Sequence, residues 1–393
     1  MMRRRITNMA LLPLAAALFL LATVISSCER KPLYLMTTAP SDLTISVYDI
    51  KLELLWGLDW RTEWQYEWDS TLWGPIGYTE PDYVRATIYN RDGEDGKRQS
   101  FFTRNFGKEG GRVSLNTSSW YDMLFYNSGT EYILFNPATD NSTFQVSTRP
   151  SSLTSYSRSF LRALPDYNQP DQLFGTMMEK MYVSDNPDDY EIIREDDGTI
   201  VYLMKVDAQM RPYTFIYLVQ VMLLHNSDSL GTRITGCDGL TLGGLAQGVE
   251  LFSRRTSLSE VNISSEDIKP LQQNRMLTLP GGDKAVGDVF ATRMLTWGLP
   301  DMVPLSTRGT RASSNGNQIG LGLHLRNGTT YSVTRDITEQ MENHPTGGII
   351  TVVLDTEEMP DSIFRPKPPT PGGSGFNASV QNWSNEFNAE IEI

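Results

Sequence analysis

Apolar and charged residues alternate over residues 50–60, and this alternation is the strongest constraint on the fold. Every even position there carries a large apolar side chain, while the odd positions include Lys51, Glu53 and Asp59. A period of two places one side of a β-strand in a core and the other in water. The preceding residues 43–47 carry their apolar side chains at odd positions, which predicts a β-bulge near Asp49.

Similar apolar stretches predict further strands along the chain. Turn signals such as Asp92-Gly93 and Asn327-Gly328 separate them, because these pairs readily adopt the positive φ of tight hairpins. The predicted strands cover residues 83–90, 132–135, 200–206, 213–224, 248–252, 319–325 and 349–355. Helical pattern is confined to residues 170–180 and 336–343. Many short strands joined by Gly, Pro and Asn turns predict an all-β protein built of β-sandwiches.

The N-terminus has the organisation of an export signal. Three arginines at positions 3–5 precede an apolar stretch over residues 9–25, which ends in Ile-Ser-Ser-Cys. Basic, apolar and small residues in this order are typical of a secretory signal peptide. The ending resembles the lipobox of bacterial lipoproteins, in which the cysteine receives a diacylglycerol and the peptide is cut before it. We expect Cys28 to carry the lipid; an ordinary signal peptide or an uncleaved anchor helix is the alternative.

Removal of residues 1–27 leaves a strongly acidic chain. Three arginines leave and no acidic residue does, so the formal charge changes from −13 to about −16. Such a charge repels phosphate backbones, and no basic stripe is evident, which excludes nucleic-acid binding. Cys237 is the only other cysteine besides Cys28, so no internal disulfide is expected, and its apolar surroundings predict a buried position.

The length of the chain and its polar and Pro- and Gly-rich stretches predict two sandwich domains. The predicted segments are a signal peptide (1–27), a lipidated linker (28–41), an N-terminal sandwich (42–185), and a C-terminal sandwich (186–393) that includes a Pro- and Gly-rich linker (366–375) and a final strand (376–393). In the final strand Phe387, Ala389, Ile391 and Ile393 lie on one face. We expect this strand to dock in its own chain or to be donated to a neighbouring subunit.

Several segments together resemble the fimbrillin-like lipoproteins of Bacteroides-type bacteria. They are Arg211-Pro212-Tyr213-Thr214-Phe215 before a long apolar strand, the Gly-rich residues 240–251, residues 336–340 before Gly347-Gly348-Ile349-Ile350, and Gly375-Phe376 before Trp383. Residues 28–33 also resemble one branch of the family whose members are mostly uncharacterised. The order of these motifs along nearly the whole chain carries the resemblance.

The resemblance implies two tandem transthyretin-like β-sandwiches of Greek-key type, displayed on the outer membrane by the lipid on Cys28. In that family a protease trims an N-terminal strand after an arginine, and the exposed groove accepts a strand from the next subunit. Arg61 is the candidate processing site, although no arginine identifies itself by its position between strands. The implied partners are the outer membrane and other fimbrial subunits. A tip, accessory or anchor protein that is never trimmed is the alternative.

No constellation of catalytic or metal-binding residues is evident. The three histidines, His225, His324 and His344, have no His, Cys or Glu partner three or four residues away. No Gly-x-Ser-x-Gly motif opens a helix. We therefore predict no enzymatic activity, no metal site and no cofactor beyond the lipid.

The segment around residues 56–78 is rich in aromatic residues. Tryptophans at positions 56, 60, 64 and 68 are four apart, and Trp73 follows. This spacing fits one face of a helix or of a strand, and the alternation before it favours a strand. Packing in a core is the favoured interpretation. The alternative is that Trp64, Trp68 and Trp73 stack on the rings of surface glycans, which would make the chain a monomeric glycan-binding surface lipoprotein rather than a fimbrial adhesion subunit.

Overall fold

The computed structural model describes residues 43–55, 61, 63–137, 143–151, 159–161, 163–228, 231–303, 316–360 and 363–364. The predictions for Cys28, for residues 1–41 and 366–375, and for Phe387, Ala389, Ile391 and Ile393 lie outside these residues. Strands dominate the described chain, which confirms the predicted all-β class. The described residues fall into two compact units. The smaller unit contains residues 43–48, Val113–Ser118 and Val183–Met204, and the larger contains Asp49–Arg112, Ser119–Tyr182 and the chain from Lys205 onward.

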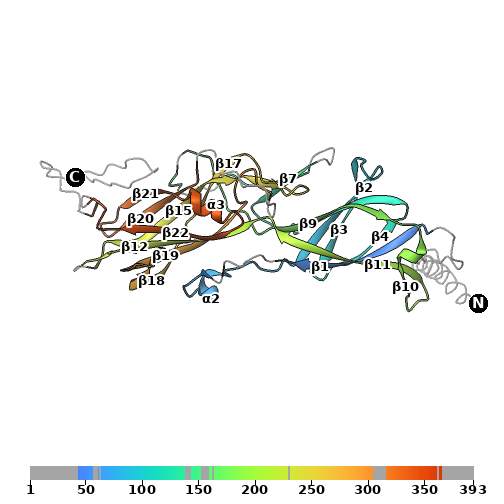
Figure 1. The fold of residues 1–393 in the computed structure, drawn as a ribbon, viewed down its shortest axis with the longest axis horizontal. Coiled ribbons are helices and arrows are strands. Elements are labelled where there is room, and N and C mark those ends of the chain that lie inside the picture. Colours follow the sequence, from blue (N-terminus) through green and yellow to red (C-terminus); the bar gives the residue numbers. More distant parts are fainter. Residues whose placement is uncertain are drawn as a thin grey trace, which may run out of the picture. The chain divides into compact units, whose positions relative to one another are not determined.

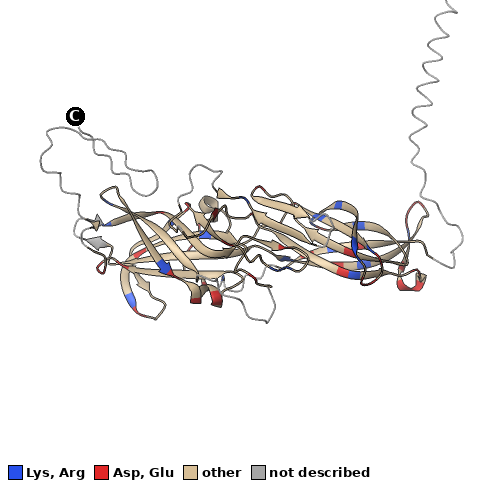
Figure 2. Cartoon of the chain, turned by 90° about the horizontal axis from the view of Figure 1, so that it is seen from above, with Lys and Arg blue, Asp and Glu red and all other residues tan. Residues whose placement is uncertain are grey.

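An eight-stranded sheet contains most strands that precede residue 213. Its order is β3–β2–β5–β9–β11–β1–β4, with β10 paired to β11. The bounds are β1 Ile45–Leu54, β2 Tyr83–Arg91, β3 Arg98–Gly107, β4 Gly111–Asn116, β5 Ser119–Tyr126, β9 Phe174–Val183, β10 Glu191–Arg194 and β11 Ile200–Pro212. Basic residues gather on β2, β3 and β4 (Figure 2). Arg91 and Arg98 bind buried Asp122, so part of this charge is neutralised inside the sheet.

The later strands form two layers around one core (Figure 1). The first layer has the order β18–β19–β12–β22, and the second has the order β21–β20–β15–β17–β8. The bounds are β8 Asp166–Tyr167, β12 Phe215–Leu224, β15 Ile234–Ala246, β17 Glu260–Ser265, β18 Lys269–Thr278, β19 Lys284–Thr296, β20 Gln318–Leu325, β21 Thr330–Asp336 and β22 Gly348–Asp355. Tyr217, Val219 and Val221 of β12 share this core with Leu242 and Leu321 from the other layer.

Smaller elements complete the described chain. A three-stranded sheet has the order β16–β7–β6, and a short hairpin joins β13 to β14. The bounds are β6 Ile133–Pro137, β7 Phe144–Thr148, β13 Ser227–Asp228, β14 Gly231–Thr232, β16 Gly248–Glu250, α2 Ser70–Trp73, η3 Pro187–Asp189 and α3 Thr338–Asn343. Within the described ranges, none of these helices has the length and apolar character needed to cross a membrane.

The helix predicted over residues 170–180 is wrong. Phe174–Val183 forms β9, which pairs with β11 by placing Gly175 opposite Arg211. The Met-Met-Glu-Lys run at 177–180 favours a helix by less than about 1 kcal/mol per residue. Hydrogen bonding within the sheet outweighs this preference. The helix predicted over residues 336–343 is confirmed by α3.

The bulge predicted near Asp49 is also wrong. β1 is one strand whose even positions, Ser46, Tyr48, Ile50 and Leu52, are all buried. The small Ser46 fills an inward position, while the side chain of Ile45 is 49% exposed. The strand ends at Leu54. The strand expected beyond residue 61 is absent from the described residues there: Arg61 and Glu63 lie in a 3-10 turn, and residues 64–69 are irregular up to α2.

The predicted domain boundary at residues 185 and 186 falls between two neighbouring strands of one sheet. β9 precedes it and β11 follows it, and these strands are hydrogen-bonded to each other. The division into two tandem sandwiches stays a prediction.

Candidate functional site

Strand β1 is an interior strand that lies between β11 and β4 in the sheet order. At its C-terminal end, the amide of Leu55 donates to the carbonyl of Met210 over 2.9 Å. Just before the strand begins, the carbonyl of Thr44 accepts from the amide of Thr117 over 3.1 Å. β1 therefore has a hydrogen-bonded neighbour on each side and buries one face.

Arg61, the predicted processing site, follows β1 by seven residues and is exposed. Its carbonyl accepts from the amide of Trp64 over 3.2 Å, which begins the packed aromatic segment. Arg61 lies in no strand and in no long helix. An exposed arginine in such a position is accessible to a protease. Processing at Arg61 stays a prediction.

Trp64, Trp68 and Trp73 lie together, as the sequence predicts, but as a cluster packed edge to face. The ring centroids of Trp64 and Trp68 are 6.3 Å apart, and those of Trp68 and Trp73 are 5.3 Å apart. The indole Nε1 of Trp68 donates to the carbonyl of Gly74 over 3.0 Å. Asp69 caps α2 by accepting from the amides of Thr71 and Leu72. All three tryptophans are half-buried.

This aromatic segment, residues 64–78, covers the outer face of the β18–β19–β12–β22 sheet. Trp64, Ile76 and Tyr78 pack against buried Ile216, Leu218 and Leu295. Tyr66 packs against a second group on the same sheet, made of Met222, Leu224, Leu277 and Val289. The even positions of β12 are therefore covered by the segment, while its odd positions face the core between the layers. Stacking of these tryptophans on sugars stays a prediction.

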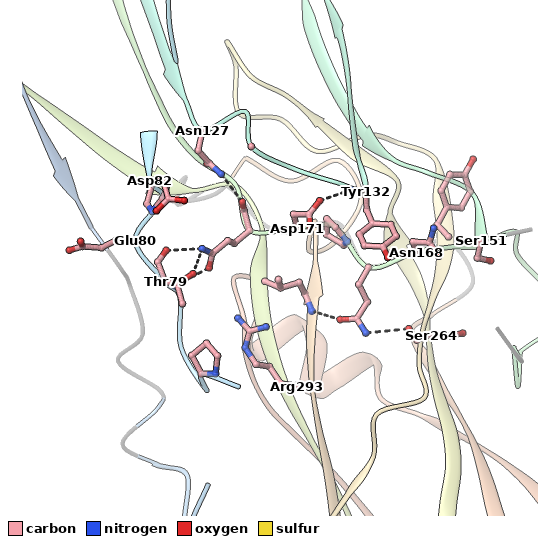
Figure 3. Close-up of a pocket in the computed structure, with 18 of the residues that line it drawn as sticks. Thr79, Glu80, Asp82, Asn127, Tyr132, Ser151, Asn168, Asp171, Ser264 and Arg293 are labelled. Carbon is pink, nitrogen blue, oxygen red and sulfur yellow. Dashed lines mark hydrogen bonds between the residues drawn. The ribbon is translucent and has the colours of Figure 1, made fainter. Parts of the chain in front are cut away.

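A polar pocket of about 810 Å³ lies beside this segment (Figure 3). Its wall comes from five stretches of chain, at residues 75–83, 127–132, 167–172, 264–266 and 293–295, together with Ser151. The polar side chains that line it are Thr79, Glu80, Asp82, Tyr83, Asn127, Tyr132, Ser151, Tyr167, Asn168, Gln169, Asp171, Gln172, Ser264, Glu266 and Arg293.

Hydrogen bonds hold the pocket wall in place. The amide group of Gln172 donates to the carbonyl of Thr79 over 2.7 Å and accepts from its N–H over 2.9 Å. Asp171 accepts from the amides of Glu131 and Tyr132 over 2.8 and 2.6 Å. Gln169 accepts from the amide of Leu295 over 3.1 Å. These contacts join four of the five stretches to one another.

Arg293 is the basic residue of this wall. Its Nε and Nη2 donate to the carbonyls of Ile76 and Gly77 over 3.1 and 3.0 Å. Burial lowers the pKa of the guanidinium from its usual value, but arginine keeps its charge at neutral pH. Four carboxylates, of Glu80, Asp82, Asp171 and Glu266, also line the pocket. No sequence pattern indicates this site, because its residues are far apart along the chain and follow no motif.

Comparison with family models finds a match over part of the chain. Residues 70–221 match the model of a family described as a domain of unknown function, DUF5119. A comparison with curated protein sequences finds no match.

Several solved structures are similar to the chain. A candidate adhesin from Bacteroides ovatus is 14% identical, with a TM-score of 0.42, over 80% of this chain and 94% of that one. Candidate polysaccharide-binding proteins from Bacteroides thetaiotaomicron are 9% identical, with a TM-score of 0.40, over 79% and 91%. The fimbrial anchor protein Mfa2 from Porphyromonas gingivalis is 10% identical, with a TM-score of 0.35, over 79% and 90%. These similar structures are named as adhesion, polysaccharide-binding and fimbrial proteins.

Proposed function

We propose that this chain is a lipid-anchored cell-surface adhesion subunit that assembles by β-strand exchange. The observation that carries the proposal is that β1 lies between β11 and β4 and is followed by the exposed Arg61. Cleavage after Arg61 would release β1 together with the lipid on Cys28. The loss of an interior strand leaves unpaired backbone on two neighbours and an open apolar groove, which a strand from another subunit can fill.

The packing of the aromatic segment supports cleavage of the chain after Arg61. After such a cut the segment stays packed on the β18–β19–β12–β22 sheet through Trp64, Ile76 and Tyr78. The new N-terminus therefore stays in place. Only the strand that precedes Arg61 is then free to leave.

The tail of the chain has the pattern of a donor strand. Inward positions of β1 recur every second residue at Ser46, Tyr48, Ile50 and Leu52. Phe387, Ala389, Ile391 and Ile393 have the same spacing. A strand with this period presents all four side chains to one face, about 7 Å apart.

Processing can be tested with an arginine-specific protease on the membrane-derived protein. We expect cleavage after Arg61, loss of the lipid, and ladders that resist sodium dodecyl sulphate. Arg61→Ala should prevent the ladders, while Arg194→Ala, at an exposed arginine of β10, should not. The proposal fails if the native protein keeps its lipid and its uncut chain while it forms ladders.

Donation by the tail has its own test. Ile391→Asp with Ile393→Asp should abolish the ladders, because a charge cannot enter the apolar groove. The matched control is Glu390→Gln with Glu392→Gln, on the opposite face, which should assemble normally. Equal ladders from both double variants would exclude the tail as donor.

Glycan binding is the second candidate function, and the pocket of about 810 Å³ favours it. Its amides, hydroxyls and tyrosines are the groups that bind sugar hydroxyls and ring faces. A polysaccharide titration followed by tryptophan fluorescence separates the two places where a sugar could bind. Loss of the signal in Asn168→Ala and Tyr132→Ala would locate the sugar in the pocket. Loss in Trp64→Ala and Trp68→Ala would locate it at the indole rings.

A further inference from the structure

His225, Asp355 and Glu357 form a cluster at one end of the four-stranded sheet, away from the residues that line the pocket. His225 directly follows β12, and Asp355 is the last residue of β22. The two strands run parallel, with Leu224 opposite Asp355, so both end at the same place. Their pairing brings together residues that are 130 positions apart.

The side chains of this cluster converge. The Nδ1 atom of His225 lies 3.0 and 3.1 Å from the two carboxylate oxygens of Asp355. One ligand atom from each of the three residues lies within 4.8 Å of the others. In a four-coordinate zinc site with bonds of about 2.0–2.2 Å, the ligand atoms are roughly 3.3 Å apart. The His225–Asp355 separation is close to this value, and a rotamer change of Glu357 can supply the remaining approach.

We propose that His225, Asp355 and Glu357 bind a divalent transition-metal ion of the zinc type. One imidazole nitrogen and two carboxylates suit zinc better than calcium, which takes six to eight oxygen ligands. With a neutral imidazole the three side chains carry two negative charges, which complement a divalent cation. Three protein ligands leave a fourth position for water or for a group from another molecule.

The backbone around the cluster is already held in place. The amide of His225 donates to the carbonyl of Val286 over 3.0 Å, and the hydroxyl of Thr356 donates to the carbonyl of His225 over 2.7 Å. The amide of Glu357 donates to Oδ1 of Asp355 over 2.9 Å. The ion therefore needs to reorient side chains only, and binding would join the end of the edge strand β22 to the interior strand β12.

The chain contains a matched control for the proposed site. His324 lies 3.3 Å from Asp238 in a second histidine–aspartate pair, whose residues are half-buried. Within the part of the chain that the structure describes, the His225 cluster is the group in which three such side chains converge. A histidine–aspartate pair without a third ligand should bind zinc far more weakly.

Calorimetric titration of the untagged chain with zinc chloride tests the proposal. We expect one zinc ion per chain in the wild type and in His324→Ala, and affinity at least about tenfold weaker in His225→Ala and Glu357→Gln. Glu357→Gln keeps the existing His225–Asp355 contact, so it separates loss of a ligand from loss of a structural pair. Zinc should also raise the unfolding temperature of the wild type, because the ion binds the folded state.

Three outcomes would overturn the site. They are zinc binding by the wild type that is no tighter than by His225→Ala, full zinc affinity in Glu357→Gln, and an unfolding temperature that rises as much with calcium as with zinc. Circular dichroism of each variant without metal shows whether it is folded. Should His225→Ala fail to fold, Glu357→Gln alone decides.

Discussion

The phenol oxygen of Tyr78 donates a hydrogen bond of 2.6 Å to the backbone carbonyl of Thr214. Thr214 immediately precedes β12, and the ring of Tyr78 also meets the ring of Phe174 on β9, with centroids 5.2 Å apart. Burial raises the pKa of Tyr78, so the phenol remains a donor at neutral pH. One side chain therefore links the end of the aromatic segment to two strands that are distant in sequence.

Replacement of Tyr78 by Phe should lower the free energy of unfolding by about 1 kcal/mol, because the ring stays and the hydrogen bond to a buried carbonyl is lost. Urea denaturation followed by circular dichroism measures the change. Tyr182→Phe, at a residue 47% exposed, is the control and should leave the stability unchanged. Equal stabilities for the two variants would show that the hydrogen bond contributes nothing.

Asp122 on β5 is a buried acidic residue of the eight-stranded sheet. Its fully buried carboxylate accepts from Arg91 over 2.6 Å, from Arg98 over 2.5 Å and from the amide of Lys180 over 2.7 Å. Asp122→Ala leaves two guanidinium groups without their buried partner, which should cost about 3–5 kcal/mol. The exposed pair of Lys108 and Glu80, 3.1 Å apart, is the comparison. Lys108→Ala should cost no more than about 1 kcal/mol. Denaturant unfolding of both variants checks the contrast, and a cost for Asp122→Ala as small as that for Lys108→Ala would contradict it.

Local patterns predict most of the strands correctly. The predictions over residues 83–90, 319–325 and 349–355 match β2, β20 and β22 to within about a residue at each end. In each of these segments the apolar pattern and the turn residues agree. At residues 170–180 they do not, because helix-forming side chains occupy a strand whose partner lies elsewhere in the sequence. Pairing across long separations is information that a local pattern lacks.

The position of the aromatic segment could have been anticipated from the apolar run that it covers. Residues 213–224 are apolar almost without interruption, and nine of the ten residues of β12 are buried. A continuous apolar run indicates a strand covered on both faces. It therefore predicts a cover for the outer face, and residues 64–78 are that cover. The pocket and the His225 cluster had no such signal, because their side chains meet only through the pairing of distant strands.

The glycines of β15 and β20 make room for one aromatic ring. A Cβ atom on Gly322 would lie 2.2 Å from Cζ of Phe160, and one on Gly239 would lie 2.8 Å from Cε2 of the same ring. Gly322→Ala should therefore displace the ring and cost about 1–3 kcal/mol of unfolding free energy. In a Phe160→Ala background the same substitution should cost much less, which gives a coupling energy above about 0.5 kcal/mol in a double-mutant cycle. Additive effects of the two substitutions would contradict the steric account.

Cys237 should be unreactive in the folded protein. It lies on β15 and is half-buried at the side of the core, rather than fully buried as its sequence surroundings predict. Its sulfur contacts the carbonyl oxygen of Gly239 at 3.4 Å, and burial of the thiol raises its pKa to about 12. A raised pKa keeps the thiol protonated well above neutral pH, and only the thiolate reacts with alkylating agents. At pH 8 we expect iodoacetamide to modify folded Cys237 about a thousandfold more slowly than the unfolded chain, whose thiol has a pKa of about 8.5.

The measurement uses protein from residue 29 onward, in which Cys237 is the single cysteine, and mass spectrometry follows the adduct with and without guanidinium chloride. The rate for folded protein should still rise between pH 9 and about 11, whereas a rate that levels off near pH 9 would show an ordinary, solvated thiol.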